Sequence, residues 1–100
     1  MATDIRITRK YDFILNVYRS TQNVEVHRNC NAVTITNTGD TICTVEGMIL
    51  YPGTPGTSLG DSRTIGGNEG EILSKKQLVL SFNVGGTNPA VEIIQKYYTS

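Results

Sequence analysis

The chain has 100 residues, of which 38% are hydrophobic, and its nine Lys and Arg residues balance nine Asp and Glu residues. That length suits one domain with a single core. The balanced charge gives no electrostatic reason to expect nucleic-acid binding, which depends on a clustered excess of Lys and Arg, and no apolar run approaches the roughly 20 residues needed to cross a bilayer. We therefore expect one soluble domain over residues 1–100 that binds neither nucleic acid nor a membrane.

The N-terminal segment, residues 1–10, alternates polar and apolar side chains, with Ile5 and Ile7 beside Asp4 and Arg6. A secretory signal would have a continuous apolar run there, so we expect the protein to be made in the cytosol. An extended segment can add itself to the sheet of a neighbouring molecule. Residues 1–10 are therefore predicted to form an extended N-terminal arm that contacts a partner.

Alternation with a period of two continues along the chain and predicts β-strands. Its apolar positions fall into three segments: Tyr11, Phe13, Leu15 and Val17; Val24 and Val26; Val33 and Ile35. No segment before residue 88 repeats apolar side chains at helical spacing. The chain is therefore predicted to be all-β and to fold as a single-domain antiparallel β-sandwich.

A first hairpin is predicted around the stretch "NTGD" at residues 37–40, where Gly39 suits a tight turn. If Asn37 faces Thr41, then Ile35 faces Cys43 and Val33 faces Val45, which puts all the apolar side chains on one face. In that register Cys30 falls opposite Met48, so the hairpin does not pair the two cysteines. We expect two buried, reduced thiols, and a disulfide would need another strand arrangement.

A second hairpin is predicted from the runs "KQLVLSF" and "AVEIIQKYY", with Phe82 facing Val91 and Leu80 facing Ile93. The alternative for the last segment is a helix, because Asn88 followed by a proline is a good helix start. The β-branched and aromatic residues that follow residue 90 favour a strand.

Residues 52–75 hold two of the three prolines and are predicted to form a long loop with short strand pieces at residues 64–65 and 71–73. A loop of this length usually has a function or is poorly ordered. Its stretch "TIGGNEGEI" lacks both the Lys-Ser/Thr pair of a phosphate-binding loop and the G-x-G-x-x-G spacing, and Glu69 and Glu71 would repel a phosphate. The glycines are therefore interpreted as turn residues.

Oxygen ligands of the kind that calcium prefers also occur in this loop: Asp61, Asn68, Glu69 and Glu71. Their spacing is not that of an EF-hand, and solvated acidic side chains are the alternative. His27 is the only histidine, and a zinc site with Cys30 and Cys43 would lack a fourth ligand. We expect no enzyme activity and no cofactor.

Three stretches, "VTITNTGDTICTVEGMILYPG", "IGGNEGEI" and "LVLSFNVGGTNPAVEIIQKYYTS", resemble the small all-β, immunoglobulin-like virion proteins of tailed bacteriophages over roughly residues 31–98. Proteins of that kind decorate the capsid or serve as minor head components; attachment to the tail or fibre remains open. The resemblance implies a structural protein of the virion, made in the host bacterial cytoplasm, that binds the major capsid protein or other virion proteins in many copies.

Candidate contact residues come from the arm, the long loop and the tyrosines, which are enriched at protein interfaces. They are Arg6, Arg9, Tyr51, Leu59, Arg63, Glu69 and Tyr98. The alternative function, from a different class, is a carbohydrate- or surface-binding β-sandwich module in which the acidic loop holds calcium.

Overall fold

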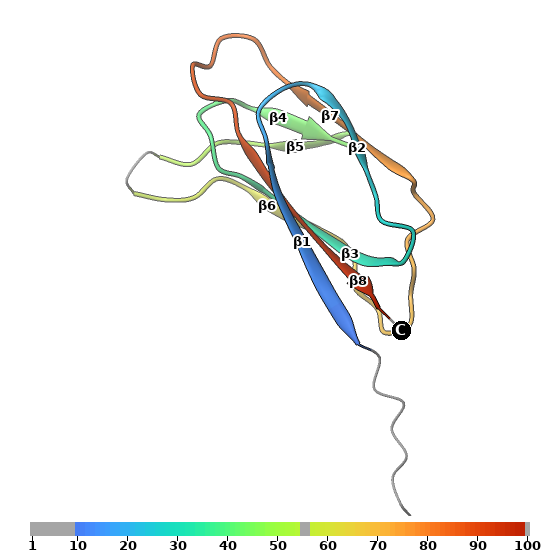
Figure 1. Cartoon of the computed structure of the whole chain (residues 1–100). Helices are drawn as coiled ribbons and strands as arrows, with labels where there is room; N and C mark the ends of the chain where they lie inside the picture. Colours follow the sequence, from blue (N-terminus) through green and yellow to red (C-terminus); the bar gives the residue numbers. More distant parts are fainter. Residues whose placement is uncertain (1–9, 55–56, 100) are drawn as a thin grey trace, which may run out of the picture.

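The computed structural model describes residues 10–54 and 57–99 and contains eight strands (Figure 1). They are β1 (Tyr11–Tyr18), β2 (Gln22–Glu25), β3 (Cys30–Asn37), β4 (Cys43–Val45), β5 (Met48–Leu50), β6 (Ser62–Gly66), β7 (Gln77–Phe82) and β8 (Val91–Tyr98). Across these two ranges there is no helix of the length and apolar character needed to traverse a membrane. The predicted all-β fold is confirmed, and so is a strand in place of a helix at the end of the chain.

The strands form two antiparallel four-stranded sheets with the orders β1-β8-β3-β6 and β2-β7-β4-β5. The first strand pairs with the last, the second with the seventh, the third with the sixth and the fourth with the fifth. This nested pairing is that of a jelly roll, in which one long hairpin is rolled into two layers. The predicted β-sandwich is confirmed, and its strand order is the jelly-roll order, whereas immunoglobulin domains have a different one.

The core lies between the two sheets and is built from alternate residues of the central strands. Its fully buried members include Val33 and Ile35 on β3, Val91 and Ile93 on β8, and Val24, Cys43, Val45, Leu50, Leu78 and Leu80 from the second sheet. Burial of an aliphatic side chain of this size stabilises the fold by about 1.5–3 kcal/mol. The apolar side chains that alternate along these strands thus hold the two sheets together.

The first predicted hairpin is wrong, because its two runs belong to different sheets. Ile35 pairs with Ile93 and Arg63, and Cys43 pairs with Leu50 and Phe82. Alternation buries the same apolar side chains in either arrangement. Two strands can lie side by side with their apolar faces on one side of a sheet, or they can lie in different sheets with those faces opposed across a core. Residues 38–42 therefore cross from one sheet to the other and do not form a hairpin turn.

The second predicted hairpin is wrong for the same reason, since residues 83–90 also connect the two sheets. Phe82 pairs with Cys43, and Leu80 pairs with Val45 and Gln22, while Val91 lies between Tyr18 and Asn37. The apolar faces of β7 and β8 do meet, but across the core.

Within residues 52–75, the predicted strand piece at 64–65 is confirmed as part of β6, and no strand forms at 71–73. In that segment the backbone makes a hydrogen bond to β3, in which Leu73 N donates to Cys30 O at 2.8 Å. Cys30 and Cys43 are buried and free, as predicted, and each lies in a different sheet. Burial raises the pKa of both thiols, that of Cys43 to about 11. The predicted arm falls outside the described residues, except for Lys10.

Candidate functional site

Four connections gather at one end of the sandwich, because a jelly roll brings alternate loops together. They are residues 19–21, 38–42, 51–61 and 83–90. Asp40, in the connection 38–42, bonds to the connection 83–90. Its Oδ1 accepts from Asn88 N at 2.8 Å, and its Oδ2 accepts from the Thr87 hydroxyl at 2.8 Å. These bonds, the Thr87 hydroxyl first, lower the pKa of Asp40 to about 2. Asp40 thus anchors the β7–β8 connection.

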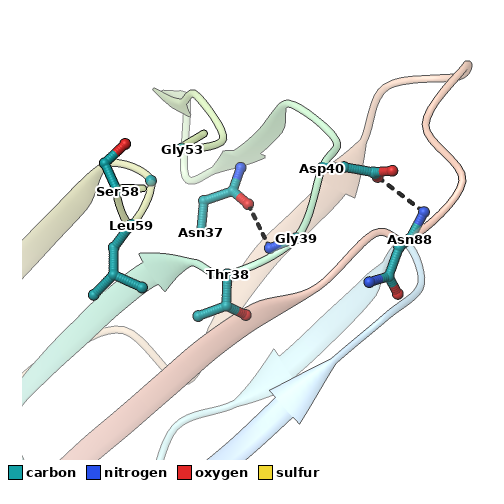
Figure 2. A pocket seen from close by; sticks show the side chains of 9 residues that line it. Asn37, Thr38, Gly39, Asp40, Gly53, Ser58, Leu59 and Asn88 are labelled. Atoms are coloured by element: carbon teal, nitrogen blue, oxygen red, sulfur yellow. Dashed lines mark hydrogen bonds between the residues drawn. The ribbon is translucent and has the colours of Figure 1, made fainter. Parts of the chain in front are cut away.

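Asn37 ties the same end of the molecule together from within (Figure 2). It is fully buried, and its Nδ2 donates to Thr41 O at 2.8 Å and to Leu50 O at 3.0 Å, while its Oδ1 accepts from Gly39 N at 3.1 Å. Thr41 lies in the connection 38–42 and Leu50 ends β5 of the opposite sheet, so this one amide links the last residue of β3 to the connection that follows it and to the opposite sheet.

A polar pocket of about 320 Å³ lies among these loops (Figure 2). It is lined by Asn37, Thr38, Gly39, Asp40, Gly53, Ser58, Leu59, Gly60 and Asn88. The glycines let backbones approach closely: a Cβ on Gly60 would lie 2.5 Å from Asn37 O. The Asn37 and Asp40 side chains already make hydrogen bonds within the loops. The hydrogen bonds of Asn37 and Asp40 are therefore structural, and the pocket is a gap left where three connections pack together.

The candidate contact residues that the structure describes do not form one surface. Tyr51 and Leu59 are exposed near the four-loop end, with 54% and 78% of their surface accessible, and Arg63 is exposed on the edge strand β6. Glu69 is exposed at the other end of β6. Tyr98 is only 4% exposed, and its hydroxyl accepts from Gly70 N at 2.8 Å, so it is not available to a partner. Arg6 and Arg9 lie outside the described residues.

The four oxygen ligands considered for calcium are also separated. Asp61 precedes β6 and accepts from Tyr51 N at 3.0 Å, whereas Asn68 follows the far end of β6, a five-residue strand that by itself spans about 16 Å at 3.3 Å per residue. Near Asn68, the backbone oxygens of Asn68 and Glu71 accept from Asn31 Nδ2. Within residues 10–54 and 57–99, no three His, Cys, Asp or Glu side chains are grouped to hold a metal ion.

His27 has a structural environment at the other end of the molecule. Its ring stacks on Tyr97 with 4.2 Å between centroids, and its Nδ1 accepts from Asn29 N at 3.0 Å. Its backbone N donates to the buried Gln95 Oε1 at 2.7 Å. These contacts fix the connection between β2 and β3. Cys30 and Cys43 lie in separate sheets, and within the described residues His27, Cys30 and Cys43 are not grouped so that they could hold a metal ion.

The exposed face of β1 is a feature that the sequence pattern did not reveal. Tyr11, Phe13, Leu15 and Val17 are 47%, 60%, 55% and 45% exposed. They point away from the core, while Ile14 and Tyr18, on the opposite face, are half-buried. Alternation predicted the strand correctly, but its more apolar side faces solvent. A signal for this was present in Ile14 and Tyr18, which give the other side enough apolar surface to pack.

The neighbouring strand continues this face only in part. Opposite Leu15 lies the half-buried Ile94, and opposite Phe13 lies Lys96. The Lys96 Nζ sits 3.9 Å from the centre of the Tyr11 ring, a cation–π contact. Further across the sheet, Thr34 and Thr36 make hydroxyl contacts with β6 at 3.3 and 2.9 Å. The apolar surface is therefore concentrated along the edge strand, beside a polar region.

No protein family, curated protein or solved structure matches this chain.

Proposed function

We propose that this protein is a structural component of a tailed-bacteriophage virion, a decoration or minor head protein, and that it acts through protein–protein contacts. The observation that carries the proposal is the row of four large apolar side chains on the outer face of β1. In the following, "the β1 face" means Tyr11, Phe13, Leu15 and Val17.

The β1 face has the properties of a contact surface. Its side chains follow one another about 7 Å apart along one side of a strand, so they form a continuous stripe. A contiguous exposed apolar patch is a common mark of an interaction site, whereas single exposed apolar residues are normal. Removal of such apolar surface from water favours association, against the entropy that two molecules lose on binding. A partner that covers the β1 face therefore gains from all four side chains.

The fold supports the proposal by analogy. Jelly rolls are found in viral capsid proteins and also in lectins, so the architecture is compatible with a virion protein and does not by itself assign a function. Of these two classes, a carbohydrate site would use polar groups free to bind a ligand. The side chains of Asn37 and Asp40 in the loop pocket instead bond the loops to one another.

The proposed mechanism is stabilisation by mass action. A subunit that binds the assembled shell, and not its separate coat proteins, shifts the equilibrium toward the shell. Repetition over many copies makes a modest contact sufficient, because the effective concentration of neighbouring sites is high. The major capsid protein is the partner that this mechanism requires.

The native assembly of the protein tests the proposal. The tagged chain is captured from producing cells without denaturant, separated on a density gradient and analysed by mass spectrometry. We expect it in particles together with coat proteins and in many copies. Recovery of the chain only as a 10.9 kDa monomer would overturn the proposal.

The N-terminal arm can be tested in the same particles. Removal of residues 1–9 leaves β1 and its face intact, so incorporation that depends on the arm falls after the deletion. Unchanged incorporation would remove the arm from the proposal and leave the contact to the described part of the chain.

A further inference from the structure

We infer that the edge of β1 pairs with β1 of a second copy of this chain, antiparallel and centred on Ile14, so that the first sheet continues from one molecule into the next. The inference concerns the backbone edge of β1 and names a second copy of the chain as the partner of that edge, in addition to the coat protein that the proposed function requires. Its test requires only the purified chain, so its failure can be distinguished from failure of the proposed function.

The first argument is the open edge. β1 ends its sheet and pairs only with β8 among the strands of the described chain (Figure 1). In an antiparallel pair, alternate residues direct both backbone groups to the same neighbour. Lys10 O accepts from Thr99 N, next to β8, at 2.9 Å, which assigns the even-numbered residues to β8. The N–H and C=O groups of the odd-numbered residues, those of the β1 face, consequently point to the open edge.

The position of Phe13 agrees with this assignment. Its backbone N–H donates at 2.8 Å to Oδ1 of its own neighbour, Asp12. The Asp12 carboxylate thus occupies one donor of the open edge. Short-range protection of this kind is a way in which proteins limit edge pairing, and it weakens a β1–β1 contact without closing the edge.

The second argument is the register. Odd residues of one copy must lie opposite odd residues of the other, because these residues direct their backbone groups to the open edge. With Ile14 at the centre, Tyr11 of each copy faces Val17 of the other, and Phe13 of each copy faces Leu15 of the other. All four side chains of the β1 face then have apolar partners. A centre at Leu15 would place Tyr11 opposite Arg19, and a centre at Phe13 would leave Val17 without an apolar partner. The sequence of β1 is therefore self-complementary in one register.

Charge is compatible with the same register. Asp12 faces Asn16, Lys10 faces Tyr18, and Ile14 faces its own copy. No like charges lie directly opposite one another between residues 10 and 18, which would otherwise destabilise the pair. A two-fold axis through Ile14 makes the contact isologous, so it closes as a dimer and does not continue as a fibre.

The size of the contact sets its strength. One pair of eight-residue strands buries less surface than the roughly 1,600 Å² of a typical stable complex. We therefore expect a weak, concentration-dependent dimer in solution, which becomes populated where many copies are held close together.

Disulfide trapping tests the register. Single cysteines are introduced as Phe13→Cys, Ile14→Cys and Leu15→Cys and exposed to mild oxidation. The unmodified chain serves as the background, because Cys30 and Cys43 are buried. In the proposed register only residue 14 lies opposite itself, with Cα atoms about 4.5 Å apart, within the range for a disulfide. We expect covalent dimer from Ile14→Cys alone. Dimer mainly from position 13 or 15, or from none of the three, would overturn the register.

Sedimentation at increasing concentration tests the pairing itself. The average mass of the unmodified chain is expected to rise from 10.9 kDa toward twice that value, and Leu15→Lys is expected to abolish the rise by placing two lysines beside apolar side chains. Val79→Lys is the matched control, since Val79 is 56% exposed on the other sheet. A chain that remains monomeric at every concentration, or an equal rise for Leu15→Lys, would overturn the inference. If the same chain is still recovered in particles, the proposed function stands.

Discussion

Asn37 is the residue at which the two-sheet arrangement can be tested most sharply by mutation. Its amide makes three hydrogen bonds in a site that solvent does not reach, two of them to carbonyl groups of Thr41 and Leu50 across the core. Asn37→Ala removes all three and leaves the C=O groups of Thr41 and Leu50 without these partners, whereas Gly39 N–H keeps its bond to Ala90 O at 3.1 Å. Such groups are costly when buried. The change should therefore destabilise the folded state strongly while leaving the apolar core unchanged.

The expected size follows from the bonds. At about 1 kcal/mol for each hydrogen bond, Asn37→Ala should lower the free energy of unfolding by about 3 kcal/mol. For a domain of this length, that corresponds to a fall in Tm of roughly 12–24 °C, at about 4–8 °C per kcal/mol. Asn37→Asp keeps the size of the side chain but sets an acceptor against the two carbonyls. It should cost at least as much at pH 7.

Urea unfolding followed by circular dichroism measures this loss, because the chain has no tryptophan for fluorescence. The matched control is Asn23→Ala, whose amide is exposed on β2 and makes a 3.5 Å contact with Gln77. Substitutions at such sites usually change stability by no more than about 0.5 kcal/mol. Equal effects of the two substitutions would refute the reasoning, since Asn37 would then not link β3 to the opposite sheet.

Three further results are expected. As the pH falls from 3.8 toward 2, the folded state should lose stability as Asp40 is protonated, because the folded-state pKa of Asp40 is about 2, below its ordinary value of 3.8. Asp40→Asn should remove this part of the pH dependence of Tm. A variant with the same pH profile as the unmodified chain would contradict the role of Asp40. Cys30 and Cys43 should react with a thiol reagent only on unfolding, because burial raises their pKa; rapid reaction of the native protein would count against their burial. Calcium and a chelator should give the same Tm, because Asp61 lies at the opposite end of β6 from Asn68; a rise of several degrees with calcium would instead favour the calcium-assisted module.

The sequence predicted the strands better than their partners, for a physical reason. The alternation of Val33 and Ile35 shows that these side chains share a face, and that face is indeed buried. It carries no information on whether Cys43 lies beside Ile35 or across the core from it. Both arrangements bury the same side chains, and the choice depends on contacts such as those of Asn37, which join residues that no local pattern connects.

The exposure of the β1 face was not predicted from the sequence, for a related reason. Phe13 and Leu15 are more apolar than Asp12 and Asn16, so periodicity alone suggests that they point inward. At the edge of a sheet, however, the inner face makes fewer core contacts: Tyr18 packs against the core, and Ile14 is half-buried. Which face of an edge strand is buried depends on the position of the strand in the sheet, and this position follows from the topology. Ile14 and Tyr18 thus indicated that either face of β1 could pack, but which of the two faces solvent could be decided only in the folded chain.

Incorporation into particles tests the central claim most directly. The unmodified chain, Leu15→Lys and Val79→Lys are each produced in cells that assemble the particles, and their copy numbers in purified particles are compared. We predict that Leu15→Lys is lost from the particles while Val79→Lys is retained at the level of the unmodified chain. Equal incorporation of all three would contradict the claim that the β1 face is the surface through which this protein acts.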